Sequence, residues 1–261
     1  MALSTLGELV RRHDPDRFLC ALFAPAERRE TLFLLYAFNH ELARAREVAS
    51  QPTLALIRLQ WWREVVEGAR RRHEIAGPLG EALDAGRLQA ADLAAMIEGR
   101  EAEADAAIPT LAAWEQYVGA AAGGVAVAAG RALAADEPML RRLRALGTAY
   151  GIGGQLRSVP ALTRQGRCQL PEEVLAAHGL TVHDVVADPR SARLMPALRA
   201  LADHGRRLLT EARGPVPRGV VAAALPAVLA RRDLARVGQP IRPRGIGDRL
   251  AVVVAGLTAR V

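Results

Sequence analysis

The sequence predicts an all-α fold. Of its 261 residues, 51% are hydrophobic but only 4% are aromatic, and alanine, leucine, valine and arginine dominate, a mixture that favours helix over strand. Apolar residues recur at spacings of three and four, and no run alternates with the period of two that a half-buried strand needs. Because the chain has neither an internal repeat nor a long linker, we expect a single domain over residues 1–261.

Proline and glycine mark where the expected helices begin and end. Pro15 is the first residue of one helix, Pro25 opens a second, and Pro52 stops that second helix shortly after Glu47. Residues 237–247 are rich in proline, glycine and arginine and form a loop before the last element. Further helices are expected over residues 54–66, 79–83, 90–103, 110–134, 137–156, 171–178, 191–212 and 220–235.

Positive charge gathers in the last third of the chain. Residues 189–261 hold 14 arginines and four acidic residues, a net charge of +10, whereas the first 188 residues carry a net charge of −3. This part can meet an anionic lipid surface or an acidic protein, or it is a solvated face. The chain has no zinc-finger spacing, glycine-rich RNA loop or aromatic stacking series, and we therefore expect no nucleic-acid partner.

The sequence leads us to expect no secretory signal and no membrane-spanning segment. The N-terminus lacks a basic stretch followed by an apolar run, and no apolar run reaches about 18 residues without a charge. Cys20 and Cys168 match no metal or redox spacing. We therefore expect a cytoplasmic protein that is at most peripheral on the inner membrane. Its attachment to anionic lipid through residues 189–261 should be weak and sensitive to salt.

Polar residues form two neighbouring stripes on the helix that follows Pro25. Asn39, Ala43 and Glu47 share one face at i, i+4 and i+8, while His40 and Arg44, together with Glu47, form the adjacent stripe. Such a set is either a surface ion network or a polar wall that faces a pocket between helices. The residues alone leave both interpretations open.

Two later segments are also candidates for a binding site. The glycine pair at residues 123–124 lies inside a predicted helix, where each glycine costs about 1 kcal/mol relative to alanine, so a packing or pocket role is expected. Arg157, Arg164 and Arg167 cluster where one helix is expected to end. They are able to hold a phosphate or to cap helix carboxyl ends.

These motifs follow one another in a specific order over residues 15–180. The matching positions are Phe18 to Phe23, Pro25, Arg28-Arg29, Tyr36-Ala37-Phe38, Trp62-Arg63, Glu98-Gly99, Glu101, Tyr117, Ala122 to Val125, Gly151, Gln155-Leu156 and Gly166 to Pro171. In this order they resemble the squalene/phytoene synthase family. The resemblance implies a single isoprenoid-synthase-like helical bundle around a central cavity. Members of that family join two prenyl diphosphates head to head with Mg²⁺ held by two Asp-rich motifs.

The metal-binding carboxylates of that family are missing from their expected places. Where the family carries Asp-Asp-x-x-Asp after Tyr-Ala-Phe, residues 43–47 read Ala-Arg-Ala-Arg-Glu. The second motif is also lost, since no Asp or Glu occurs between Gln155 and Pro171. Mg²⁺ needs hard oxygen ligands. We therefore expect no catalytic residue, no metal site and no cofactor, with Mg²⁺ implied only if the chain is an active enzyme.

The altered pattern resembles the branch of the family that serves as an assembly factor for respiratory complex I. The shared features are Tyr-Ala-Phe-Asn, Leu-Gln-Trp-Trp-Arg and Gly-Arg-x-x-Leu-Pro. The resemblance implies a non-catalytic assembly or scaffold factor at a membrane surface. Its partner would be a client membrane-protein subunit or a lipid or isoprenoid. An active head-to-head prenyl transferase that uses Glu41, Glu47, Glu98 and Glu101 stays open, as does an isoprenoid or lipid carrier.

The central cavity of such a fold defines the candidate site. The resemblance places the two polar helices on opposite walls of that cavity. The expected lining residues are Asn39, His40, Ala43, Arg44, Glu47, Tyr117, Gln155 and Ser158. The expected anion-binding residues are Arg44, Arg157 and Arg164.

Overall fold

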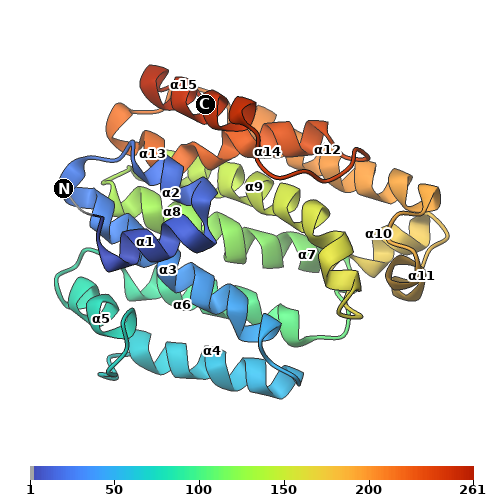
Figure 1. Cartoon of the computed structure of the whole chain (residues 1–261), viewed down its shortest axis with the longest axis horizontal. Helices are drawn as coiled ribbons and strands as arrows, with labels where there is room; N and C mark the ends of the chain where they lie inside the picture. Colours follow the sequence, from blue (N-terminus) through green and yellow to red (C-terminus); the bar gives the residue numbers. More distant parts are fainter. Residues whose placement is uncertain (1–2) are drawn as a thin grey trace.

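The computed structural model describes residues 3–261, and within this range the chain forms helices and no β-strand (Figure 1). The all-α prediction is confirmed. The first half contains α1 (Thr5–His13), α2 (Pro15–Ala21), α3 (Ala26–Glu47), α4 (Pro52–Val66), α5 (Ala76–Asp84), α6 (Ala90–Glu101), η1 (Ala102–Ala104), α7 (Leu111–Val118), η2 (Gly119–Gly123) and α8 (Gly124–Ala132). The second half contains α9 (Glu137–Thr163), α10 (Glu172–Ala177), α11 (Val182–Ala187), η3 (Ala192–Leu194), α12 (Met195–Glu211), η4 (Arg218–Val220), α13 (Val221–Ala224), α14 (Pro226–Ala235) and α15 (Ile246–Thr258).

Helices α3, α8 and α9 form the centre of the bundle. Helix α8 packs against both α3 and α9, and α9 also contacts α12 and α14. Every residue of α3 from Thr31 to Asn39 is buried, as in a helix surrounded by protein on all sides. Figure 1 shows α4 along the lower edge of the bundle and α15 along the upper edge. The buried apolar side chains form one connected core that extends from Val10 to Ala255.

Small residues allow η2 and α8 to lie close to α9. A Cβ atom added at Gly147 of α9 would lie 2.5 Å from the Cβ of Ala126 and 2.9 Å from the carbonyl oxygen of Ala122. A Cβ atom at Gly123 would lie 2.6 Å from the Thr148 hydroxyl. The glycines at this contact therefore have a packing role, because a larger side chain would push the two helices apart.

Two glycines of α9 are expected to respond in opposite directions to the same substitution. Gly147→Ala overpacks the contact with α8 and should lower the free energy of unfolding by about 1–3 kcal/mol. Gly154→Ala meets no heavy atom within 4 Å and should raise it by up to about 1 kcal/mol, because alanine is the better helix former. Urea denaturation of both variants measures the difference. Equal changes in the two variants would contradict the packing described for Gly147.

The structure changes several of the expected helix boundaries, most clearly in α9, η2 and α14. Helix α9 continues past residue 156 to Thr163 and includes Pro160. The proline lies in the last turn, where the helix is about to end and a missing backbone N–H interrupts little of it. The helix expected over 110–134 is divided by the π-helical turn η2 (Gly119–Gly123). The helix expected over 220–235 is two helices, because α14 begins at Pro226.

Candidate functional site

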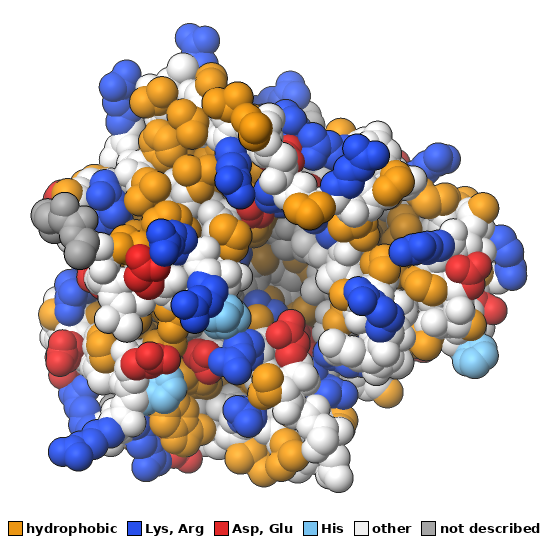
Figure 2. All heavy atoms as spheres, viewed as in Figure 1, with side chains coloured by type: hydrophobic (Ala, Val, Ile, Leu, Met, Phe, Trp, Pro, Cys, Tyr) orange, Lys and Arg blue, Asp and Glu red, His pale blue; other side chains and the backbone are white. Residues whose placement is uncertain are grey.

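A cavity of about 540 Å³ opens among α2, α3, α7, η2, α9 and the loop before α15. Figure 2 shows a hollow near the middle of this face of the molecule. Apolar side chains such as Val118, Leu162 and Ile241 form part of the wall, and charged side chains form much of the remainder. The cavity therefore has a mixed wall of apolar and charged side chains inside a helical bundle.

Five of the eight expected lining residues meet in this cavity. Helix α3 contributes Ala43 and Glu47, which lie one turn apart. Tyr117 comes from α7, and Gln155 and Ser158 come from α9. Residues that are about 70 to 115 positions apart in the sequence therefore line one pocket.

His40 and Arg44 do not line the cavity, and the expectation for them is wrong. The ring of His40 stacks on that of His13, with 4.4 Å between the centroids. Burial and the neighbouring His13 lower the pKa of His40 below its ordinary value. Arg44 is exposed and forms an ion pair with Glu41 at 2.9 Å. Successive helical residues point about 100° apart, so the residue after Ala43 turns away from the pocket.

Asn39 and Arg164 are also not among the lining residues. Asn39 is buried behind the wall, where its Oδ1 accepts a hydrogen bond of 3.3 Å from Nη2 of Arg100, a lining residue. Arg164 is exposed at the end of α9 and donates from Nε to the carbonyl oxygen of Pro160 at 3.0 Å. Of the three arginines expected to bind an anion, only Arg157 lines the cavity.

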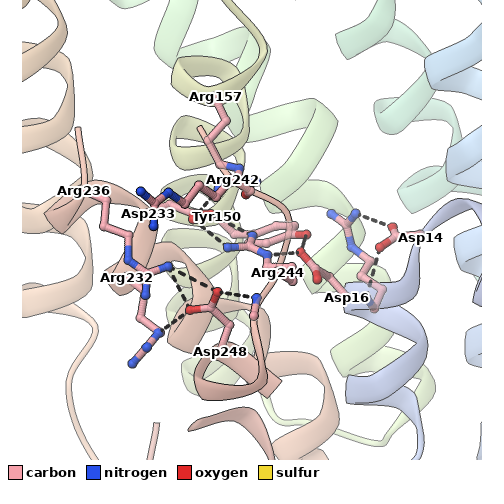
Figure 3. A network of polar contacts seen from close by, with 12 residues as sticks. Asp14, Asp16, Tyr150, Arg157, Arg232, Asp233, Arg236, Arg242, Arg244 and Asp248 are labelled. Atoms are coloured by element: carbon pink, nitrogen blue, oxygen red, sulfur yellow. Dashed lines mark hydrogen bonds and ion pairs between the residues drawn. The ribbon is translucent and has the colours of Figure 1, made fainter. Parts of the chain in front are cut away.

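A network of ion pairs lies along one side of the cavity (Figure 3). Arg244 donates from Nη1 and Nη2 to the two carboxylate oxygens of Asp233, at 2.6 and 2.8 Å, and from Nε to Asp16 at 2.8 Å. Arg157 donates to Asp233 at 3.2 Å, and the hydroxyl of Tyr150 donates to Asp16 at 3.3 Å. The network joins α2, α9, α14 and the loop before α15.

Burial and charge both act on the arginines of this network. The side chain of Asp233 is only 1% exposed. Burial opposes the charged form of Arg244, but its bonds to Asp233 and the charge of Asp16 outweigh that effect and raise its pKa. Arg17 pairs with Asp14 at 2.8 Å and lies 4.9 Å from the centroid of the Tyr150 ring. These guanidinium groups stay charged and already have partners.

A second network occupies the wall formed by α7, η1 and α9. The buried carboxylate of Glu103 accepts hydrogen bonds from Arg100 at 2.6 Å and from the Tyr117 hydroxyl at 2.7 Å. Gln155 donates from Nε2 to the Tyr117 oxygen at 2.8 Å, and its own buried Oε1 has no hydrogen-bond partner among residues 3–261. Burial and the charge of Glu103 raise the pKa of Tyr117 well above its ordinary value. The phenol therefore acts as a neutral hydrogen-bonding group.

The donor set of the cavity does not fit a magnesium cluster. Five carboxylates line it, and of these only Glu47 lacks an arginine partner within the described chain. Within residues 3–261, no group of three or more His, Cys, Asp or Glu side chains is placed to hold a metal ion. A Mg²⁺ ion needs several free oxygen ligands. The four paired carboxylates are Asp14, Asp16, Glu103 and Asp233.

The fold and the order of motifs along it agree with one protein family. Residues 10–243 match the squalene/phytoene synthase family, and the chain belongs to that family. Its fold is similar to that of a dehydrosqualene synthase in complex with a ligand, with a TM-score of 0.80 and 16% identity over 97% of this chain and 94% of that one. It is also similar to a squalene synthase from Alicyclobacillus acidocaldarius, with a TM-score of 0.69 and 20% identity over 88% and 90% of the two chains.

The similar curated proteins are named for a role other than prenyl synthesis. A protein of Mus musculus, "NADH dehydrogenase (ubiquinone) complex I, assembly factor 6", is 29% identical over 232 residues, which cover 85% of this chain and 68% of that protein. The protein of the same name from Rattus norvegicus is 28% identical over 228 residues with the same coverage. In the described chain no helix has the length and apolarity needed to cross a membrane.

Proposed function

We propose that this chain is a non-catalytic member of its family that acts as an assembly factor for a complex I-type respiratory enzyme. The similar proteins named as complex I assembly factors support this role, since the similarity extends over 85% of the chain. The observation that carries the proposal is the pairing of the cavity carboxylates with arginines.

The ion pairs act against the chemistry of a synthase in two ways. A metal ion that recruited Asp233 would have to displace Arg244 and Arg157, both of which lie partly buried beside it. Breaking such a pair leaves buried charge without compensation and costs about 3–5 kcal/mol. The arginines also place positive charge beside the carboxylates, which disfavours a divalent cation. The resulting cavity suits recognition better than ionisation of a diphosphate.

The proposed partner is a client membrane-protein subunit, met at the surface of the membrane. The cavity favours a lipid or isoprenoid as a second partner, because its volume of about 540 Å³ and its mixed wall are typical of small-molecule sites. Native mass spectrometry of the purified chain would reveal such a ligand if it is retained.

Deletion of the gene in its host is the experiment for the assembly role. We expect membranes of the deletion strain to hold less assembled complex I and less NADH:quinone oxidoreductase activity, with succinate:quinone activity unchanged. The wild-type chain supplied in trans should restore assembly. If complex I stays at its normal level while a C30 or C40 isoprenoid disappears from the lipid extract, the chain is instead an active prenyl transferase.

A further inference from the structure

Helix α15 (Ile246–Thr258) is apolar on the side that faces away from the protein. Its inner side packs against α14 and α2 through Val252 and Ala255, with Asp248 also buried. Its outer side carries four large aliphatic residues whose exposed fractions range from 56% to 78%. The spacing of four, four and three residues places them on one face of the helix. They are Ile246, Leu250, Val254 and Leu257.

This stripe is one of two groups of exposed large aliphatic residues in the described chain, the other being Val48, Leu54, Leu56 and Ile57. Four of the ten large hydrophobic residues exposed within residues 3–261 belong to it. It extends over about 17 Å along the helix, at a rise of 1.5 Å per residue. A protein in water normally turns such a face inward, and an uncovered apolar stripe with a polar rim marks a contact surface.

Every exposed charged residue in residues 239–261 is an arginine. Arg249 belongs to α15, Arg242 to the loop before it and Arg260 to the segment after it, and all three are exposed. No carboxylate lies within ion-pair distance of these three in the described chain. Asp248 is the only acidic residue after Asp233, and it is buried under Arg232 and Arg236. Figure 2 shows the orange apolar surface at the upper left with blue arginines at its edge.

We propose that α15 docks this protein onto a bilayer that carries anionic headgroups. The four aliphatic side chains enter the boundary between headgroups and acyl chains, and the surrounding arginines contact lipid phosphates. This inference rests on the helix alone and holds whether or not the chain assembles complex I.

Charge favours a membrane over a second copy of the chain. In a two-fold dimer the same patch would face itself, and each cationic rim would meet another cationic rim. An anionic bilayer meets the rim with opposite charge and accepts a convex aliphatic stripe without requiring a matching groove. Raised salt weakens the arginine contribution, whereas the aliphatic contribution remains.

Vesicle flotation of the full chain tests the proposal. The wild type is expected to float with vesicles of equal parts phosphatidylcholine and phosphatidylglycerol, and much less with phosphatidylcholine alone. Leu250→Asp should weaken partitioning into the vesicles by about tenfold or more, because the variant no longer transfers a leucine side chain from water into the bilayer. Ile57→Asp is the matched control, since Ile57 of α4 is 59% exposed, against 56% for Leu250. It should float like the wild type.

Two further measurements decide between the membrane and other occupants. Arg242→Gln combined with Arg249→Gln should lower binding to the anionic vesicles and leave binding to neutral vesicles unchanged. Size-exclusion chromatography with light scattering should give one mass for the wild type and for Leu250→Asp. A wild-type dimer that Leu250→Asp dissociates, equal flotation of Leu250→Asp and the wild type, or equal losses in Leu250→Asp and Ile57→Asp would overturn the proposal. Circular dichroism verifies that each variant is folded.

Discussion

Asp233→Ala is expected to lower the free energy of unfolding by about 3–5 kcal/mol. The Asp233 side chain is 1% exposed and accepts two hydrogen bonds from Arg244 and one from Arg157. Removing it leaves two partly buried guanidinium groups without that counter-charge. The loop before α15 would also lose its attachment to α14, because Arg244 makes that connection.

Asp203→Ala is the control for this substitution. Asp203 also forms an ion pair with an arginine, Arg206, but both side chains are exposed. Its removal should therefore lower the free energy of unfolding by less than about 1 kcal/mol. Urea denaturation at neutral pH gives both values. If Asp233→Ala costs no more than Asp203→Ala, the buried network does not hold the cavity together as described.

Returning carboxylates to α3 is expected not to create a magnesium site. Ala43→Asp combined with Arg44→Asp restores two acids of the first motif, but the opposite wall holds none between Gln155 and Pro171. The other cavity carboxylates remain paired with arginines. Calorimetry with a non-hydrolysable prenyl diphosphate should therefore give the same result with and without Mg²⁺, for the variant and for the wild type.

Two outcomes of that titration have different meanings. Strong binding that requires Mg²⁺ would contradict the account and revive the enzyme interpretation. Binding that is indifferent to Mg²⁺ would indicate an anion pocket formed by the cavity arginines. Arg167 would then be the first residue to replace, because it lines the cavity and its one side-chain hydrogen bond within residues 3–261 is to the carbonyl oxygen of Glu103, at 3.5 Å.

Much of the fold and one part of the site can be predicted from the sequence. Prolines at helix starts and the spacing of apolar residues predict the helices. The order of motifs predicts that α3 and α9 lie on opposite sides of a cavity. Ala43 and Glu47 lie one turn apart, so a single helix face carries both. The π-helical turn η2 has no such signal, because its alanines and glycines do not distinguish a π-helical turn from an ordinary α-helix.

The rest of the site depends on contacts between distant parts of the chain. Asp233 and Arg244 come from the C-terminal third, outside the region that carries the motifs, and each is an ordinary charged residue in the sequence. His40 and Arg44 are misplaced because α3 is buried on all sides along much of its length, so polarity does not identify the face that meets the cavity. The outer stripe of α15 is missed for a different reason: Leu250 and Val254 lie within an apolar run over residues 250–255, which does not single out one helix face.

The central claim is that a synthase fold persists here without the chemistry of a synthase. Turnover is its most direct test, with the purified chain, farnesyl or geranylgeranyl diphosphate and Mg²⁺, and a squalene synthase as the positive control. The account predicts unchanged substrate and no coupled product. Formation of a C30 or C40 product above the level of a heat-inactivated sample would contradict it.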